Sequence, residues 1–235
     1  MQAVILAAGR GTRLQPLTDT IPKAMVKVNG KPMLQIVLEQ LKTVNVKEVV
    51  IIVHYLKEKI IDYFGNGSKF GLKIKYVEQK EMKGTADAVA HAEPHITDDK
   101  FWLIFCDSLF ETDQLTRILE HKDVDGVFTC KEVEDGRAFG ILVTDGKKVT
   151  QFIEKPEHPP TNLASFSVFM MPKEIFEACK KVKPKTKGEL WLTDAIQILI
   201  DSGKTFSYEK SKHILDIGTH EQLAEAQELA KKLGL

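Results

Sequence analysis

Five residues near the amino terminus have the types and spacing suited to binding phosphate groups. Gly9 and Gly11 lack side chains, so successive backbone N–H groups can approach a ligand closely and form a concave anion nest. Arg10, Arg13 and Lys23 add charge, because arginine offers a planar fork of donors to phosphate oxygens and lysine a compact point charge. By residue type alone, the segment is either a phosphate-binding loop or a basic surface loop.

The length and spacing of this segment narrow the choice of motif. Roughly 25 residues separate the first strand pattern from the first clear helical pattern, and a loop that long in a compact domain is usually functional or disordered. Leu14 stands where a dinucleotide-binding fingerprint has its third glycine. Within residues 6–25 the Walker A triplet of glycine, lysine and serine or threonine does not occur either.

Asp107 is a second candidate for chemistry. It comes just after the apolar stretch FWLIF, residues 101–105, and therefore at the carboxyl end of an expected strand. Open parallel sheets bind their ligands at this edge. A carboxylate there either holds a magnesium ion together with phosphate oxygens or caps the following turn.

The elements that must position these residues alternate between strand and helix in the first half of the chain. Four short runs, rich in β-branched and aromatic residues, have the continuous hydrophobicity of strands covered on both faces. They lie at residues 2–6, 49–53, 72–77 and 101–105. Helical patterns follow Pro32, up to Val44, and cover residues 56–64. This alternation predicts an α/β fold with a Rossmann-like, mainly parallel central sheet flanked by helices.

The rhythm changes after residue 124. Closely spaced strand patterns follow, with Asp145-Gly146 marking a hairpin turn, so this half contains a β-rich insertion into a mixed sheet. Helices are expected at 173–181, 193–202 and 219–233, the last beginning with a capping box from Thr219 to Gln222. We expect one domain over residues 1–235, with a lobe at 1–124 and a second lobe at 125–235 that includes the closing helices.

The overall charge argues against a general attraction to polyanions. The 235 residues include 33 Lys and Arg and 33 Asp and Glu, so the formal net charge is zero and neither nucleic acid nor a membrane surface is an expected partner. The sequence has no apolar run long enough to span a bilayer and no signal-peptide pattern, which predicts a cytoplasmic protein. Three scattered cysteines fit reduced thiols.

The opening segment resembles a known family signature. The stretch LAAGRGTRL at residues 6–14, followed by PLT at 16–18 and PK at 22–23, is similar to the signature of sugar-1-phosphate nucleotidylyltransferases, also called nucleoside-diphosphate-sugar pyrophosphorylases. In that family the glycine-rich loop and its arginine hold the nucleoside triphosphate, and the lysine contacts the reacting phosphates. The resemblance implies catalytic roles for Arg13, Lys23 and Asp107. It implies that the nucleotide is bound by Leu6, Ala8, Gly9, Arg10, Gly11, Thr12, Gln79 and Gly84.

Further stretches resemble the family in the same order along the chain. Gln79 and Gly84 are similar to its base-reading segment, and an amide presents a donor and an acceptor that suit a uracil or thymine imide. Gly140, Glu154 and Lys155 resemble its sugar-phosphate site, where a carboxylate accepts hydrogen bonds from sugar hydroxyls. Without the resemblance, these residues read as ordinary strand ends and turns.

Two later stretches extend the resemblance. Asp216, in the sequence DIGT, is similar to the family's second metal ligand, so the resemblance implies that Asp107 and Asp216 together hold Mg²⁺. The stretch ELWLTD at residues 189–194 resembles the segment after the β insertion, where we expect Asp194 to cap a helix. Residues 165–167, SFS, depart from the family pattern in the strand that lines its sugar pocket, so the sequence does not identify the sugar.

The implied reaction transfers a nucleoside monophosphate from an NTP, with UTP or dTTP favoured, to a sugar 1-phosphate such as glucose 1-phosphate. The products are an NDP-sugar and pyrophosphate. One alternative is a cytidylyltransferase acting on phosphocholine or an inositol phosphate, and another is a non-catalytic regulatory paralogue that binds nucleotide sugars. Family members are commonly homodimers or homotetramers, and no C-terminal β-helix domain is expected in this chain.

Overall fold

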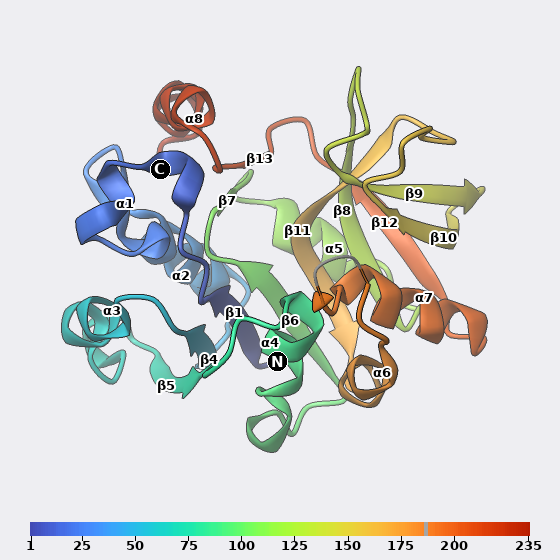
Figure 1. Ribbon diagram of the computed structural model, residues 1–235, viewed down its shortest axis with the longest axis horizontal. Coiled ribbons are helices and arrows are strands. Elements are labelled where there is room, and N and C mark those ends of the chain that lie inside the picture. The colour runs from blue at the N-terminus through green and yellow to red at the C-terminus, as the bar shows by residue number, and fades with distance from the viewer. Residues whose placement is uncertain (186–187) are drawn as a thin grey trace.

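The fold is built on a mixed sheet with helices on both faces (Figure 1). A computed structural model describes residues 1–185 and 188–235, and across these residues nine strands form the sheet in the order β5-β4-β1-β6-β11-β8-β12-β10-β9. The strands are β1 Ala3–Ala7, β4 Glu48–Val53, β5 Lys73–Glu78, β6 Lys100–Phe105, β8 Gly126–Glu132, β9 Gly140–Asp145, β10 Lys148–Glu154, β11 Leu163–Pro172 and β12 Phe206–Lys210.

The first half of the sheet is parallel. β1 pairs in parallel with both β4 and β6, and β4 pairs in parallel with β5. These strands confirm the four strands predicted from hydrophobicity, each to within one residue. The side chains of β1, β4 and β6 are buried on both faces, which explains why their sequences show continuous rather than alternating hydrophobicity, whereas the edge strand β5 is largely exposed.

The second half adds antiparallel strands. β11 joins the two halves, because it runs antiparallel to β6 on one side and to β8 on the other. β9 and β10 form the predicted hairpin, and Gly146 in its turn has a φ of +57°. The sequence pattern does not predict β12, which has only two buried residues among its five and lies parallel to β8.

Helices cover the two faces with separate cores. On one face α2 (Met33–Thr43), α3 (Lys57–Phe64) and α5 (Gln114–Leu119) pack against one set of strand side chains. On the other face α4 (Thr85–Ala90), α6 (Ile175–Lys181) and α7 (Leu192–Asp201) pack against the alternate set. Successive strand residues point to opposite faces, so the central strands β1, β4, β6, β8 and β11 contribute to both cores.

The opening segment, which the sequence predicts to be a loop, contains several short elements. It contains 3₁₀ turns at η1 (Thr12–Leu14) and η2 (Lys23–Met25), the short helix α1 (Leu17–Thr20) and the small antiparallel pair β2 (Lys27–Val28) and β3 (Lys31–Pro32). The first long helix begins after Pro32, as predicted. These short turns hold side chains in fixed positions. They are too short to leave a periodic hydrophobic pattern in the sequence, so the sequence could not reveal them.

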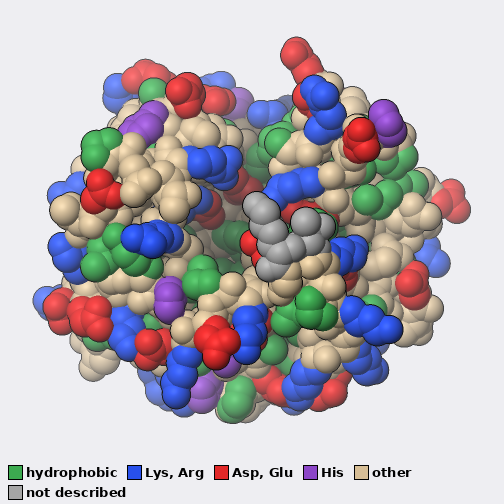
Figure 2. Space-filling view, in the orientation of Figure 1, with side chains coloured by type: hydrophobic (Ala, Val, Ile, Leu, Met, Phe, Trp, Pro, Cys, Tyr) green, Lys and Arg blue, Asp and Glu red, His purple; other side chains and the backbone are tan. Residues whose placement is uncertain are grey.

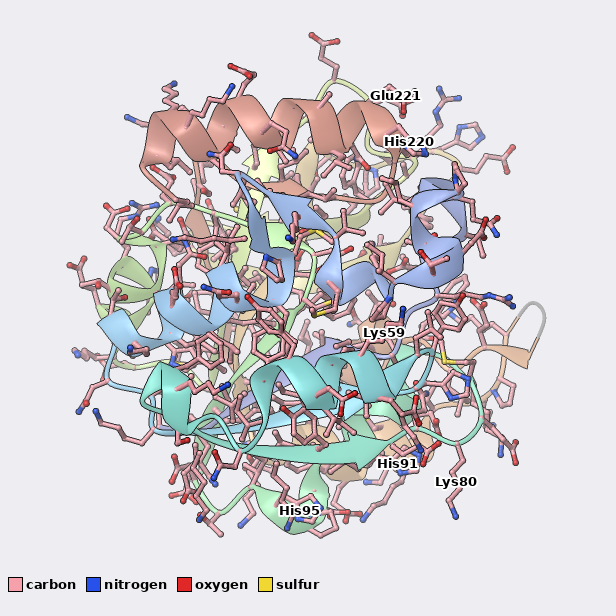
Figure 3. The ribbon with its side chains drawn as sticks, turned by 90° about the vertical axis from the view of Figure 1, so that its left-hand side faces the viewer. Lys59, Lys80, His91, His95, His220 and Glu221 are labelled. Carbon is pink, nitrogen blue, oxygen red and sulfur yellow. The ribbon has the colours of Figure 1, made fainter. Side chains whose placement is uncertain are left out.

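The last helix closes over this opening segment. α8 (His220–Leu233) crosses it in Figure 3, with His220 and Glu221 at its N-terminal end. Apolar residues of α8 share a third core with Leu14 and the β2–β3 pair, and His220 Nε2 contacts Gln15 O at 2.8 Å. Thr219 caps the helix by accepting a hydrogen bond from Gln222 N at 3.3 Å, which confirms the predicted cap.

A pair of two-residue strands completes the fold. β7 (Ser108–Leu109) follows β6 directly, and β13 (Leu215–Asp216) precedes α8. The two strands run antiparallel, so residues far apart in the sequence meet above the sheet. Across the part of the chain that the structure describes, no helix combines the length and apolar character needed to cross a membrane.

Candidate functional site

A cleft lies at the carboxyl ends of β1 and β6. Within the described residues it consists of two adjoining cavities, a larger one of about 570 Å³ and a smaller one of about 360 Å³. Lys23, Asp107, Glu154 and Lys155 line both cavities, so the two meet at these side chains. Figure 2 shows a hollow near the centre of this face of the molecule. This is the edge at which open parallel sheets bind ligands.

Lys23 and Asp107 form an ion pair where the two cavities meet. The Lys23 ammonium bonds Asp107 Oδ2, and the two side chains are only 15% and 14% exposed. Burial opposes the charge on Lys23, but the Asp107 carboxylate outweighs this effect and raises the pKa of the lysine. Lys23 is therefore held in its charged form beside a cavity.

Gly11 fixes the position of Lys23. Its φ is +69°, and a Cβ atom at this position would lie 3.0 Å from Lys23 Cβ and 3.1 Å from Thr18 Cγ2. Thr18 Oγ1 donates a hydrogen bond to Gly11 O at 2.7 Å, which fixes this backbone conformation. The glycine allows both the left-handed conformation and the close approach of the lysine stem.

The β7–β13 pair brings Asp216 next to Asp107. Asp216 lies opposite Ser108 in the register, and Ile217 N donates to Asp107 O at 3.0 Å. Both acids line the larger cavity. The structure thus supplies the proximity that a separation of 109 positions in the sequence does not reveal.

Two serines hold the Asp216 carboxylate. Ser108 Oγ donates to Oδ1 at 2.8 Å, and Ser167 Oγ donates to Oδ2 at 3.1 Å. Burial and the negative charge of Asp107 raise the pKa of Asp216 to about 6, even though the two serine hydrogen bonds and Lys23 oppose this shift. Ser167 lies in the stretch that departs from the family pattern, and sequence reasoning did not identify either serine as a support for this acid.

Arg13 lies against the turn before α8. A Cβ atom on Gly218 would lie 2.8 Å from Arg13 Nη2 and 3.2 Å from Gln222 Oε1, so a side chain there would require the guanidinium to shift. Gly218 N donates to Gln222 Oε1 at 2.9 Å. Arg13 and Gly218 both line the larger cavity.

The smaller cavity contains most of the residues predicted to bind the nucleotide. Leu6, Ala8, Gly9, Gln79 and Gly84 line it. Gln79 is 1% exposed, and its Nε2 donates to Gly84 O at 3.1 Å and to Asp87 Oδ2 at 2.8 Å. The amide nitrogen of Gln79 is thus already occupied by internal partners.

Three other predicted nucleotide-binding residues lie elsewhere. Arg10, Gly11 and Thr12 are outside both cavity linings among the described residues. The Arg10 guanidinium lies 5.1 Å from the centre of the Tyr55 ring, an arrangement typical of a cation–π contact. Gly11 acts on the site through Lys23 rather than by lining the cavity.

The larger cavity contains the residues predicted to bind the sugar phosphate. Gly140, Glu154 and Lys155 line it, and a Cβ on Gly140 would lie 2.5 Å from Phe152 Cε2. Lys155 has a φ of +42°, which costs a non-glycine residue about 1–2 kcal/mol. Its exposed ammonium lies 3.2 Å from Glu154 Oε1. Backbone strain at a lysine beside a cavity is typical of functional positions.

Two hydroxyl groups on the wall of the larger cavity are buried without a hydrogen-bond partner. They belong to Ser165 and Thr193, and neither finds a donor or acceptor in the described part of the chain. Buried hydroxyls normally find a partner, so these two are exceptions in the wall of the cavity. Ser165 belongs to the stretch that departs from the family pattern.

The expected role of Asp194 as a helix cap is wrong. α7 begins at Leu192 with Trp191 as its N-cap residue, so Asp194 lies inside the first turn. Its Oδ1 accepts from Lys185 Nζ at 2.7 Å instead. The helix starts earlier because Leu192 N already has a partner, Thr85 Oγ1, at 2.9 Å.

No group of three or more metal-binding side chains gathers anywhere in residues 1–185 and 188–235. His91 and His95, four positions apart, are labelled on the underside of the molecule in Figure 3. α4 ends before His91, and His95 lies in a separate 3₁₀ turn, so the two do not share a helix face.

Comparisons with known proteins support this description of the fold. The family model described as nucleotidyl transferase matches residues 2–232. The UTP–glucose-1-phosphate uridylyltransferase AglF of Haloferax volcanii is 40% identical over 235 aligned residues, which cover 97% of this chain and 96% of AglF. The bifunctional protein GlmU of Methanocaldococcus jannaschii is also 40% identical, but this chain spans only 53% of its length.

Solved structures have the same fold. A Bacillus anthracis protein assigned as a glucose-1-phosphate thymidylyltransferase superposes with a TM-score of 0.88 at 26% identity, covering 98% of this chain and 96% of that one. A UDP-glucose pyrophosphorylase complexed with UDP-glucose superposes with a TM-score of 0.85 at 26% identity, covering 98% of each chain. These likenesses confirm the predicted fold class and the predicted family resemblance.

Proposed function

Because this chain belongs to the nucleotidyl transferase family, we propose that it transfers a nucleoside monophosphate from UTP or dTTP to glucose 1-phosphate or a similar sugar 1-phosphate. The chain is an enzyme of the sugar-1-phosphate nucleotidyltransferase type, as are relatives that match it over nearly its whole length. The cytidylyltransferase and regulatory readings of the sequence have no comparable support. We place the reaction in the cytoplasm, where nucleoside triphosphates are available.

One observation carries this proposal: the two cavities meet at the charged Lys23. The smaller cavity has an amide and glycine backbone suited to a base, and the larger has a carboxylate and unpartnered hydroxyls suited to a sugar. A nucleoside in one cavity and a sugar in the other would bring their phosphates together at this lysine. We therefore assign the 1–124 half to the NTP and the 125–235 half to the sugar phosphate, within one domain.

The chemistry requires positioning and charge rather than a general base. A phosphate monoester with a second pKa near 6 is largely dianionic at neutral pH. Its oxygen attacks the α-phosphorus of the NTP, a new P–O bond forms, and the bond to the leaving pyrophosphate breaks. The protein must hold two polyanions in line and stabilise the charge that develops on the leaving group.

Three cationic side chains are placed for this task. The Lys23 ammonium is already charged where the two cavities meet. It would move away from Asp107 to contact the reacting phosphates. Arg13, held against Gly218, would stabilise the leaving pyrophosphate with its fork of donors. Lys155 is exposed and lines both cavities, which suits it to the sugar phosphate.

Asp107 and Asp216 fit a Mg²⁺ ion of the kind the family uses. Mg²⁺ binds through one or two carboxylates together with phosphate oxygens, so a pair of acids is sufficient. The fit is supported by the position of Asp216 beside Asp107, where burial and the negative charge of Asp107 raise the pKa of the Asp216 carboxyl. When bound, Mg²⁺ would neutralise charge on the triphosphate.

A substrate panel tests the proposal. Pyrophosphate release is measured with Mg²⁺ for each common NTP, paired with the 1-phosphates of glucose, mannose and N-acetylglucosamine, with muramate phosphate and, as the contrasting acceptor, with phosphocholine. We expect the fastest release with UTP or dTTP and glucose 1-phosphate, and none with phosphocholine.

Two outcomes would overturn the proposal. Release only with CTP and phosphocholine would establish the cytidylyltransferase reading. Tight binding of an NDP-sugar without turnover for any pair would establish the regulatory reading. Analytical ultracentrifugation of the same preparation would test the homodimer or homotetramer that we propose from the family.

A further inference from the structure

Trp191 and Met82 lie at the smaller cavity, and no part of the proposed reaction yet uses them. Met82 is 50% exposed, the highest value among the large hydrophobic side chains that the structure describes. Ligand cavities are lined predominantly by apolar and aromatic side chains, so a ligand in this cavity can cover these two. The question is which part of the substrate covers them.

The backbone around Trp191 is fastened to the segment that contains Gly84. Leu190 N donates to Lys83 O at 2.8 Å, and Ala86 N donates to Leu190 O at 2.9 Å. A Cβ on Gly84 would lie 2.5 Å from Leu190 O, so the two backbones are in direct contact. Trp191 is the next residue along and is thus held beside Gly84.

The indole ring of Trp191 is itself restrained. Its Nε1 donates to Glu189 Oε2 at 3.1 Å, and Lys185 Nζ lies 5.4 Å from the ring centre. A flat ring that is already restrained loses little conformational entropy when a ligand stacks on it. Gln79 and Gly84, by contrast, offer only polar edges and backbone.

From this arrangement we infer that Trp191 and Met82 form an apolar wall that packs against the face of the nucleobase, while Gln79 and Gly84 meet its edge. This inference rests on the proposed function, which places the nucleoside in the smaller cavity. Every base has a flat π face, so stacking contributes affinity with little selectivity among bases. Trp191 is then a positioning residue that the 125–235 half of the chain supplies to the nucleotide.

Tryptophan fluorescence can test this inference directly. The chain has two tryptophans, Trp102 and Trp191, and Trp102 is fully buried in β6. A base that stacks on Trp191 changes the fluorescence of that indole. We expect UTP to alter the intrinsic emission, whereas inorganic tripolyphosphate, which has the phosphates and no base, leaves it unchanged.

Substitutions at Trp191 distinguish its role as a fluorescent reporter from its role as a stacking surface. Trp191→Phe keeps an aromatic face, so we expect it to lose the fluorescence response while its KM for UTP stays within about 3-fold of wild type. Trp191→Leu should raise the KM for UTP about 10-fold through the loss of stacking, with little change in kcat or in the KM for glucose 1-phosphate. Met82→Ala should raise the KM for UTP by a smaller factor.

Tyr63→Leu is the matched control, because Tyr63 is an exposed aromatic residue, 42% exposed, on α3 and outside both cavities among the described residues. It should leave every kinetic constant near wild type. If UTP is turned over normally but leaves the emission unchanged, or if Trp191→Leu keeps the wild-type KM for UTP, the inference is wrong and the proposed function stands. An equal response to tripolyphosphate would also overturn it. If no NTP binds at all, both proposals fail together.

Discussion

The ammonium group of Lys23 has one anionic partner in the structure and would have another in the proposed reaction. It is paired with Asp107 at the junction of the two cavities. An incoming triphosphate must compete with this carboxylate for the lysine. The pair therefore keeps a cation in place before the substrate arrives and prevents a buried charge from standing alone.

Lys23→Ala should lower kcat by about 10²–10³, the typical effect of removing one group that stabilises transition-state charge. We expect the variant to remain folded, as judged by far-UV circular dichroism, because Lys23 lies at a cavity and not in a packed core. The measurement is pyrophosphate release with saturating substrates.

Lys47→Ala is the control for the removal of a lysine, because Lys47 is exposed between α2 and β4. It should behave as wild type. A kcat for Lys23→Ala within a factor of about 3 of the wild-type value would contradict the assignment, since the lysine would then contribute almost nothing to the transition state.

Gly11→Ala tests the geometric role of the glycine. Gly11 and Gly30 both have positive φ values, +69° and +81°, so alanine at either should cost about 1–2 kcal/mol in the free energy of unfolding. An added Cβ at Gly11 would press on Lys23, whereas nothing lies within 4 Å at Gly30. Only Gly11→Ala should also lower kcat/KM.

The readouts for this pair are urea unfolding and steady-state kinetics on both variants. Equal losses of kcat/KM in Gly11→Ala and Gly30→Ala would mean that backbone strain alone affects activity, and that Gly11 has no specific effect on Lys23.

At the scale of single residues, the sequence identifies the types of the groups in the cleft better than their contacts. Arg13, Lys23 and Asp107 all line the larger cavity. Arg10 is of equally suitable type, yet it lies over Tyr55, because a flexible basic side chain takes whichever partner the fold offers. Ser108 and Ser167 contact Asp216 through pairings that depend on three-dimensional proximity.

Among the elements, the smallest ones determine the site. β7 and β13 have two residues each, too few for any hydrophobic period to be recognised, and they lie far apart in the sequence. Their pairing nevertheless places Asp216 beside Asp107. The parallel strands β1, β4 and β6 are predictable because they are buried on both faces, whereas β12 is not, because its pattern is short and half exposed.

Glu111 fastens the elements around this pair. It follows β7 closely and accepts hydrogen bonds from Ser211 Oγ at 2.8 Å and from Lys212 N at 2.8 Å, in the segment that leads to β13. Arg117 Nη2 of α5 lies 3.1 Å from the same carboxylate. Burial alone would raise the pKa of Glu111, but these hydrogen bonds and the Arg117 charge outweigh it and lower the pKa.

Glu111 should therefore stabilise the fold at neutral pH. A carboxyl whose pKa is lowered by folding contributes its full stabilisation above the ordinary value of 4.5, and loses it as the pH falls through the lower folded value. Glu111→Gln should unfold at lower urea concentration than wild type at pH 7, and this difference should shrink below pH 4.5.

The control variant is Glu58→Gln, which removes one exposed carboxyl from α3. Urea unfolding of the three proteins at several pH values gives the comparison. A difference between wild type and Glu111→Gln that stays constant from pH 7 into the acid range would show that ionisation of Glu111 does not stabilise the fold.

Considering the whole molecule, the alternation of strands and helices and the later cluster of strands were sufficient to predict the fold class. They could not predict that β11 pairs with both β6 and β8, which joins the two halves into one sheet. The hydrophobic pattern of a segment indicates that it forms a strand. It does not indicate which strand lies beside it in the sheet, because any buried strand satisfies the same hydrophobic requirement. The way in which the two halves join into one sheet is therefore visible only in the folded structure.

The contact between Arg13 and Gly218 has a consequence for how the enzyme is made. Arg13 is synthesised well before Asp216 and Gly218, the glycine against which its guanidinium lies. A nascent or proteolytically shortened chain that ends before residue 216 lacks both. With the roles proposed above for Arg13 and Asp216, such a fragment would lack part of the charge needed around a triphosphate, and incomplete chains would not consume the nucleotide pool of the cell.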